Sequence, residues 1–85
     1  MKKLLNERDF FQTSDLALCA TLCCCGFHLE AIDKQNSNKA IFLIKRESGL
    51  DDHITEYWHH NLKVEPLTFF GCLKEIKSRI YENNY

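Results

Sequence analysis

Residues 16–25 form an apolar run that contains a single polar side chain. A helix that is apolar on nearly every side is buried, because it has no polar face to present to water. Thr13 or Ser14 supplies the hydroxyl typical of a helix N-cap, and Gly26 suits the left-handed position that follows a helix. The run is shorter than the roughly 20 apolar residues needed to cross a membrane. The pattern predicts a core helix over residues 14–25, with the other elements packed around it.

The pattern after Gly26 changes from helical to alternating. In residues 27–33 apolar side chains alternate with His and Glu, as in a strand with one buried face. Residues 34–39 are polar and rich in Asn, which indicates a turn. Residues 40–46, rich in Ile, give the clearest strand signal, so the two strands are predicted to form an antiparallel hairpin. Both faces near residues 41–44 are apolar. One face is expected to meet the core helix, and the other to meet another element or a second chain.

Two further helices are expected in the second half of the chain. Ser48 is a suitable N-cap for a helix over residues 49–60, and Asn61 can end that helix in the left-handed region. Pro66 occupies the first-turn position that proline favours. From there apolar residues recur every three to four positions, which predicts an amphipathic stripe facing the core. The stripe consists of Leu67, Phe70, Leu73, Ile76 and Ile80.

These elements define an α+β fold. The predicted order is a possible short strand at residues 10–12, then a helix, two strands and two helices. A small antiparallel β-hairpin thus packs against three helices. A chain of 85 residues holds one small domain, which we place at residues 10–82. Residues 1–9 and 83–85 are expected to be flexible termini.

Charge and cysteine content narrow the class of protein. The chain has 11 Lys and Arg against 12 Asp and Glu, whereas proteins that bind nucleic acid through its phosphates are usually basic. Four of the five cysteines, Cys19, Cys23, Cys24 and Cys25, fall on the predicted core helix. Neighbouring side chains there diverge and cannot meet disulfide geometry. Buried thiols are expected instead, and no signal peptide is recognisable. The sequence therefore predicts a cytoplasmic protein.

The sequence holds no recognisable catalytic or cofactor-binding motif. Cys19 and Cys23 lie one turn apart, but a closed zinc site needs four ligands, and Cys72 with a histidine lacks the usual spacing. No two histidines have the H-x3-H spacing, and no glycine-rich phosphate loop is present. We expect a non-enzymatic protein with no catalytic residue, cofactor, metal, small-molecule substrate or membrane partner.

The first candidates for contacts with a partner are apolar. Trp58 is expected in the core, whereas its neighbour Tyr57 either joins it there or is exposed as an interface anchor. Ile41 and Leu43 belong to the strand at residues 40–46, whose edge is predicted to be exposed. An exposed edge is a site for pairing with another chain.

A second group of candidates is basic. Lys74, Lys77 and Arg79 lie on the last helix, where Glu75 interrupts them. Together with Lys45, Arg46 and Lys63 they are a candidate strip for holding phosphates, with Tyr81 or Tyr85 available to stack on a base. The alternative is a solvated helix face stabilised by ion pairs between residues three or four apart.

Three segments carry a resemblance to a known family: FFQTSDLALCATL, GFHLEAIDKQNSNKAIFLI and YWHHNLKVEPLTFFGCLKEIKSRIY. They follow one another over residues 10–81 as in a group of small bacterial and phage-borne proteins that is known as a domain of unknown function. The cysteine run departs from the small aliphatic residues of that group, and Glu65 stands where it has a capping Asp or Asn. The resemblance implies no activity or site residue, but its setting in phages and mobile elements implies an accessory or regulatory role.

Two hypotheses follow from the sequence. The first is a protein-interaction module that binds an unknown protein or itself, with pairing through the edge of the strand at residues 40–46. The second is a nucleic-acid-binding accessory protein of a phage or mobile element. Because the net charge is −1, binding of nucleic acid is expected to be weak or absent.

Overall fold

The computed structural model describes residues 9–34 and 39–82. Within these residues the chain forms six elements, which confirms the predicted α+β fold, including the short first strand. In order they are β1 (Phe10–Thr13), α1 (Leu16–Cys24), β2 (Leu29–Asp33), β3 (Ile41–Lys45), α2 (Leu50–Trp58) and α3 (Pro66–Glu82). Apart from Asp9, the termini predicted to be flexible lie outside the described residues.

The three strands form one antiparallel sheet with the order β1-β3-β2. β2 and β3 pair as the predicted hairpin, while β1 pairs along the other side of β3. The predicted free edge at residues 40–46 is therefore wrong, because β3 is the central strand and is hydrogen-bonded on both sides. Its high content of Ile and Phe fits a strand with neighbours on both sides. β1 and β2 form the edges instead.

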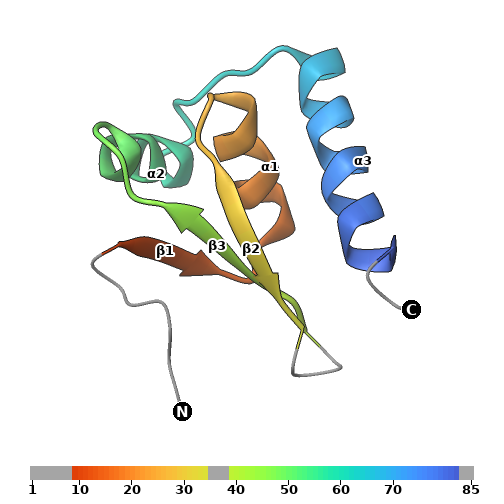
Figure 1. The fold of residues 1–85 in the computed structure, drawn as a ribbon. Coiled ribbons are helices and arrows are strands. Elements are labelled where there is room, and N and C mark those ends of the chain that lie inside the picture. Colours follow the sequence, from red (N-terminus) through yellow and green to blue (C-terminus); the bar gives the residue numbers. More distant parts are fainter. Residues whose placement is uncertain (1–8, 35–38, 83–85) are drawn as a thin grey trace.

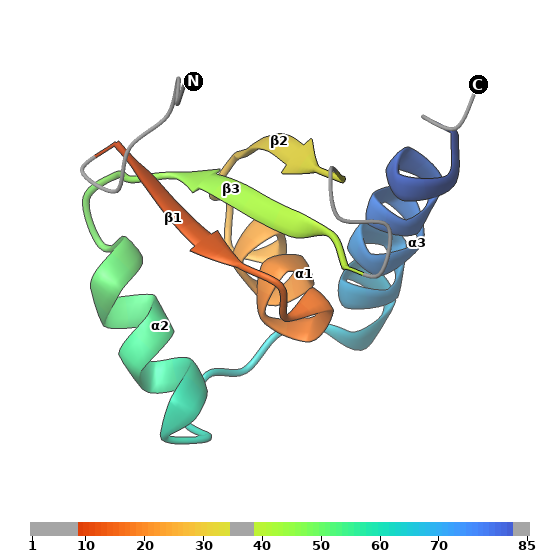
Figure 2. The same ribbon diagram turned by 90° about the horizontal axis from the view of Figure 1, so that it is seen from below.

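All three helices lie on one face of the sheet (Figure 2). Side chains alternate between the two faces of a strand. On β3, Phe42 and Ile44 point toward the helices and are 2% and 0% exposed. Ile41 and Leu43 point to the opposite face, which no helix of the described residues covers. Leu43 is nevertheless buried, at 6% exposure, although it does not belong to the core cluster beneath the sheet.

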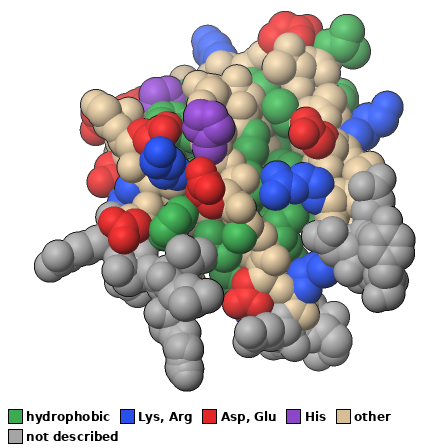
Figure 3. All heavy atoms as spheres, viewed as in Figure 1, with side chains coloured by type: hydrophobic (Ala, Val, Ile, Leu, Met, Phe, Trp, Pro, Cys, Tyr) green, Lys and Arg blue, Asp and Glu red, His purple; other side chains and the backbone are tan. Residues whose placement is uncertain are grey.

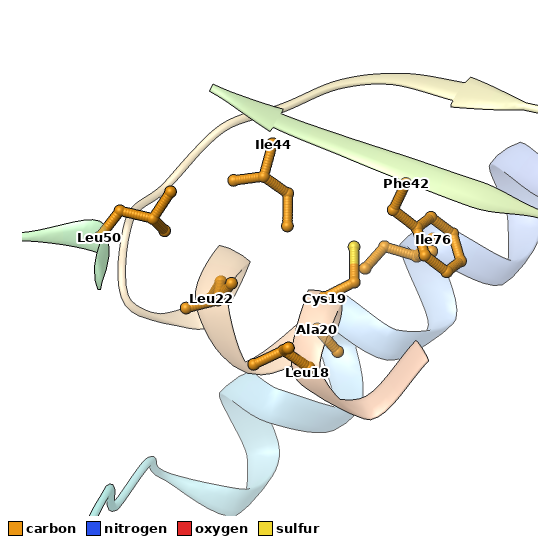
Figure 4. Packing of buried hydrophobic residues seen from close by; sticks show 8 residues of the cluster. All are labelled: Leu18, Cys19, Ala20, Leu22, Phe42, Ile44, Leu50 and Ile76. Carbon is orange, nitrogen blue, oxygen red and sulfur yellow. The ribbon is translucent and has the colours of Figure 1, made fainter. Parts of the chain in front are cut away.

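The core helix α1 lies under the centre of the sheet, and α2 and α3 flank it on opposite sides (Figures 1 and 2). Its middle is almost fully buried, which confirms the burial predicted from its composition. The cluster around it joins all layers of the fold (Figure 4): Leu18, Cys19, Ala20, Leu22, Phe42, Ile44, Leu50 and Ile76. Leu50 comes from α2 and Ile76 from α3, so both outer helices contribute to a single core.

The ends of α1 differ in part from the prediction. Its N-cap is Asp15, whose carboxylate accepts a hydrogen bond from the backbone N–H of Leu18 at 3.1 Å. The Thr13 hydroxyl accepts instead from the N–H of Asp15, so neither Thr13 nor Ser14 caps the helix. Gly26 does follow the helix with φ of 101°, a left-handed conformation that glycine adopts without a Cβ clash.

The ends of α2 also differ from those expected. Gly49, not Ser48, is the N-cap, with φ of 91° and no side-chain hydrogen bond. The left-handed residue beyond the helix is His60, with φ of 65°, and not Asn61. At each end the observed residue lies one position from the predicted one, which is within the one or two residues to which helix ends are defined.

α3 begins at Pro66 as predicted, but its inward stripe differs. The residues packed against the core are Phe69, Cys72, Leu73, Ile76 and Ile80. Leu67 and Phe70 are 78% and 56% exposed. Residues three positions apart on a helix differ in direction by about 60°. Leu67 lies three such steps before Ile76, so the two side chains point about half a turn apart. The predicted stripe therefore runs partly round to the outside of the helix.

Candidate interaction site

The side of α3 that faces away from α1 carries both large apolar and basic side chains. We call this surface the outer face of α3, and it consists of Leu67, Phe70, Lys74, Lys77 and Tyr81. These residues follow one another at intervals of three or four positions, which places them on one side of the helix. Tyr81 is 66% exposed, and both lysines are exposed. Figure 3 shows basic and hydrophobic side chains at the surface of α3. Large exposed apolar groups rimmed by charge are typical of a binding surface.

The first turn of α3 is fixed by Glu65. Its carboxylate accepts hydrogen bonds from the backbone N–H of Thr68 at 2.7 Å and from the Thr68 hydroxyl at 2.8 Å. These hydrogen bonds lower the pKa of Glu65 below its ordinary value, and the bond from the Thr68 backbone N–H contributes most. Glu65 thus caps the first turn of α3, and it anchors the turn that presents Leu67 and Phe70.

On α3 the structure brings together two of the three basic residues that were predicted to belong to a strip, and Tyr85, the other candidate for stacking, lies outside the described residues. Lys74 and Lys77 share the outer face of α3, whereas Arg79 is half-buried on the side of the helix that faces α1. There its charge acts on the thiols of Cys19 and Cys23. The three basic residues therefore do not form one phosphate-binding strip.

Cys19 and Cys23 form a thiol pair in α1 beside α3. Their hydrogen bond raises the pKa of the Cys19 thiol, which burial raises further. The same bond lowers the pKa of the Cys23 thiol, and the charge of Arg79 adds to that lowering. Cys23 is half-buried while Cys19 is 0% exposed. The two thiols of the pair thus differ, with the pKa lowered at the half-buried Cys23 and raised at the buried Cys19.

Two further thiols, those of Cys24 and Cys25, have pKa values above the ordinary one. Burial raises the pKa of Cys24, and contact with the Cys72 thiol across the α1–α3 interface raises it further. Burial also raises the pKa of Cys25. All five cysteines are free thiols. Among the described residues, no three His, Cys, Asp or Glu side chains lie together as a metal site requires.

Of the two aromatic residues at the end of α2, Tyr57 packs against the core, which is one of the two positions left open for it, and Trp58 does not. Tyr57 is half-buried against the core, where burial raises the pKa of its phenol, and its ring meets that of Trp58 edge-on at 5.0 Å. Trp58 is 56% exposed, so its predicted core position is wrong. Consecutive helical residues differ in direction by about 100°, so the two cannot both face α1. One turn before Tyr57 on the same helix, the His53 ring packs edge-on against Phe27, with the ring centroids 5.0 Å apart.

The apolar residues predicted on β3 do not lie near the outer face of α3. Ile41 is half-buried and Leu43 buried, both on the helix-free face of the sheet. In the described part of the chain, the exposed large apolar side chains are those of Trp58, Leu67, Phe70 and Tyr81. Three of these four belong to α3. Sequence reasoning found the lysines but assigned Leu67 and Phe70 to the core. Their spacing relative to Ile76 was the signal that places them outside.

The fold and the site together define a small α+β domain that presents an amphipathic outer helix. The chain matches the model of a domain of unknown function, DUF5659, over residues 8–82, and it belongs to that family. No curated protein and no solved structure matches it. Within residues 9–34 and 39–82, none of the helices combines the length and apolar character that a membrane crossing requires.

Proposed function

We propose that this chain is a non-enzymatic protein-interaction module that binds its partner through the outer face of α3. We place it in the cytoplasm of a bacterium or of a phage-infected cell, the setting implied by the resembling proteins. The observation that carries the proposal is the exposure of Leu67 and Phe70 on a helix whose other side is packed against α1.

These two side chains add little to the stability of the monomer, because most of their surface stays in water. Burying a large apolar side chain against a partner gains about 1.5–3 kcal/mol. Lys74 and Lys77 lie beside them on the same face, where charges orient a partner and exclude like-charged surfaces. The outer face of α3 thus combines apolar contacts for affinity with cations for specificity.

A photo-crosslinking amino acid placed at position 70 in living cells tests the proposal. Glu75 is the matched control position, because it is exposed on the same helix but lies about 140° round from Phe70. We expect a discrete protein adduct from position 70 that disappears in the Lys74→Glu/Lys77→Glu background, and none from position 75. Equal adducts from both positions, or no adduct from either, would refute the proposal.

Binding of nucleic acid is the alternative function. This alternative rests on Phe70 and Tyr81, which lie on the same face as two lysines. Proteins that bind single-stranded nucleic acid combine aromatic side chains, on which the bases stack, with cations that contact the phosphates. The position of Arg79 on the other side of α3 leaves only two basic residues on this face. Since phosphate-driven affinity grows with the number of cations, the protein-interaction module is the better supported function.

A further inference from the structure

The contact between α1 and α3 brings cysteines from distant parts of the sequence to one level of the fold. The two helices pack side by side and run in opposite directions (Figure 1), and Cys19 and Ile76 belong to one core cluster between them (Figure 4). Cys72 lies four residues before Ile76 on α3. Cys23 and Cys24 lie four and five residues after Cys19 on α1. Because both helices rise equally per residue, Cys72 is level with Cys23 and Cys24.

The thiols of Cys24 and Cys72 meet across this contact. A hydrogen bond joins the two thiols, and both residues are half-buried and unoxidised. The axes of packed helices are about 8–10 Å apart and each Cα lies about 2.3 Å from its axis, so Cα atoms that face each other are roughly 3.5–5.5 Å apart. This range overlaps the roughly 4.4–6.8 Å between the Cα atoms of a disulfide. A bond between these two sulfurs therefore fits the packing of the helices.

We propose that Cys24 and Cys72 form a modification site, at which a small-molecule disulfide such as oxidised glutathione converts the two thiols into a reversible disulfide between α1 and α3. One thiol of the pair attacks the small disulfide as its thiolate, so that a mixed disulfide forms and one small thiol leaves. The second thiolate attacks the protein sulfur of the mixed disulfide and expels the other small thiol. The protein loses two electrons and two protons, and the small disulfide becomes two thiols.

The surroundings of the pair set its rate of oxidation. Burial, and next the neighbouring Cys72 thiol, raise the pKa of Cys24 above its ordinary value. The reactive species is the thiolate, so oxidation is slow at neutral pH and becomes faster as the pH rises. Cys19 is 0% exposed, which keeps a small disulfide away from it. In a compartment that keeps thiols reduced, such a bond is transient and responds to the redox state.

The disulfide fixes α3 against α1 without covering the outer face of α3. Cys72 points about 160° away from Phe70 and about 140° away from Leu67 round the helix, so the outer face stays open in both redox states. The site is thus independent of the proposed function. The bond joins positions 24 and 72, which are far apart in the sequence, and a link across a long loop stabilises a fold by restricting the unfolded chain. We expect oxidation to raise Tm by roughly 10–25 °C.

Titration of the purified chain with mixtures of reduced and oxidised glutathione tests the proposal. Acid quenching, alkylation of the remaining thiols and mass spectrometry should detect a chain lighter by two hydrogen atoms, with the peptide of Cys72 linked to that of α1. Cys24→Ser should abolish the link, whereas Cys23→Ser and Cys25→Ser, at the flanking positions, should keep it. The folded chain should reach half oxidation at a share of oxidised glutathione about tenfold or more below that of the urea-unfolded chain, because folding holds the two thiols together.

Four results would overturn the inference. These are a folded chain that oxidises no more readily than the unfolded one, a glutathione adduct with no internal link, a link that survives Cys24→Ser, and a disulfide between two chains. Circular dichroism melts of Cys24→Ser and Cys72→Ser establish that both variants fold. The melt of the oxidised wild type gives an independent readout: a higher Tm that returns to its original value with a reducing agent supports the native link, and an unchanged or lower Tm contradicts it.

Discussion

Truncation of Leu22 measures how far the fold depends on the burial of α1. Leu22 is 0% exposed and belongs to the cluster that joins the sheet to all three helices. Leu22→Ala loses about 2–2.5 kcal/mol of transfer free energy, and the cavity it leaves brings the total to about 3–4 kcal/mol. A domain of 85 residues has an unfolding free energy of about 4–13 kcal/mol. The substitution therefore removes a large share of the total stability.

Thermal and urea unfolding followed by circular dichroism provide the assay. At about 4–8 °C per kcal/mol, we expect Leu22→Ala to lower Tm by roughly 15–25 °C. Ile76→Ala, at a residue 3% exposed on α3, should have an effect of similar size. Lys74→Ala on the outer face of α3 is the control and should change the unfolding free energy by less than about 0.5 kcal/mol. If Leu22→Ala lowered the free energy of unfolding by less than about 1 kcal/mol, α1 would not be covered on several sides.

Three further predictions concern the helix cap, the thiols and nucleic acid. Glu65→Ala should lower Tm at neutral pH. Because the pKa of Glu65 is lowered in the folded protein, the difference in Tm between variant and wild type should shrink as the pH falls through that pKa. A difference in Tm that does not change with pH would exclude a capping role for the Glu65 carboxylate. The rate at which iodoacetamide alkylates Cys23 should rise with pH around a midpoint that is lower than in the unfolded chain, because the pKa of this thiol is lowered. Arg79→Gln should raise the midpoint, and mass spectrometry of the labelled peptides measures it. Fluorescence anisotropy should detect at most weak, salt-sensitive binding of single-stranded DNA; a sub-micromolar complex lost in Lys74→Ala/Lys77→Ala would make nucleic-acid binding the leading function.

The sequence predicts the fold well because its strongest signals are local. The apolar run before Gly26, the change to alternation after it and Pro66 at a helix start each have a direct physical reason. The order of the strands in the sheet could not be predicted from local signals, because it depends on β1. Four residues at Phe10–Thr13 show little more than a preference for extended structure, and nothing local records that they pair with β3 about 30 positions on.

The candidate site is less predictable because it depends on the rotation of each helix. Tyr57 and Trp58 are equally suited to a core, and only the folded chain shows that Tyr57 is the one packed against it. On α3 the sequence offers overlapping apolar stripes, and the one that contains Phe69 faces the core. Once Ile76 is assigned to the core, its spacing from Leu67 places Leu67 on the outside, but which stripe contains the core residue is decided by the surfaces that meet.

The central position of β3 has a consequence for synthesis on the ribosome. The chain emerges from its N-terminus, so β1 and α1 leave the ribosome before the strand to which β1 pairs exists. β2 and β3 can then form a hairpin locally, and β1 joins it across the longer interval. The last element to emerge is α3, which covers the side of α1 that carries Cys19 and Cys23. The most apolar helix is thus among the first segments made and the last to be fully covered, so the nascent domain depends on its C-terminal residues for protection from aggregation.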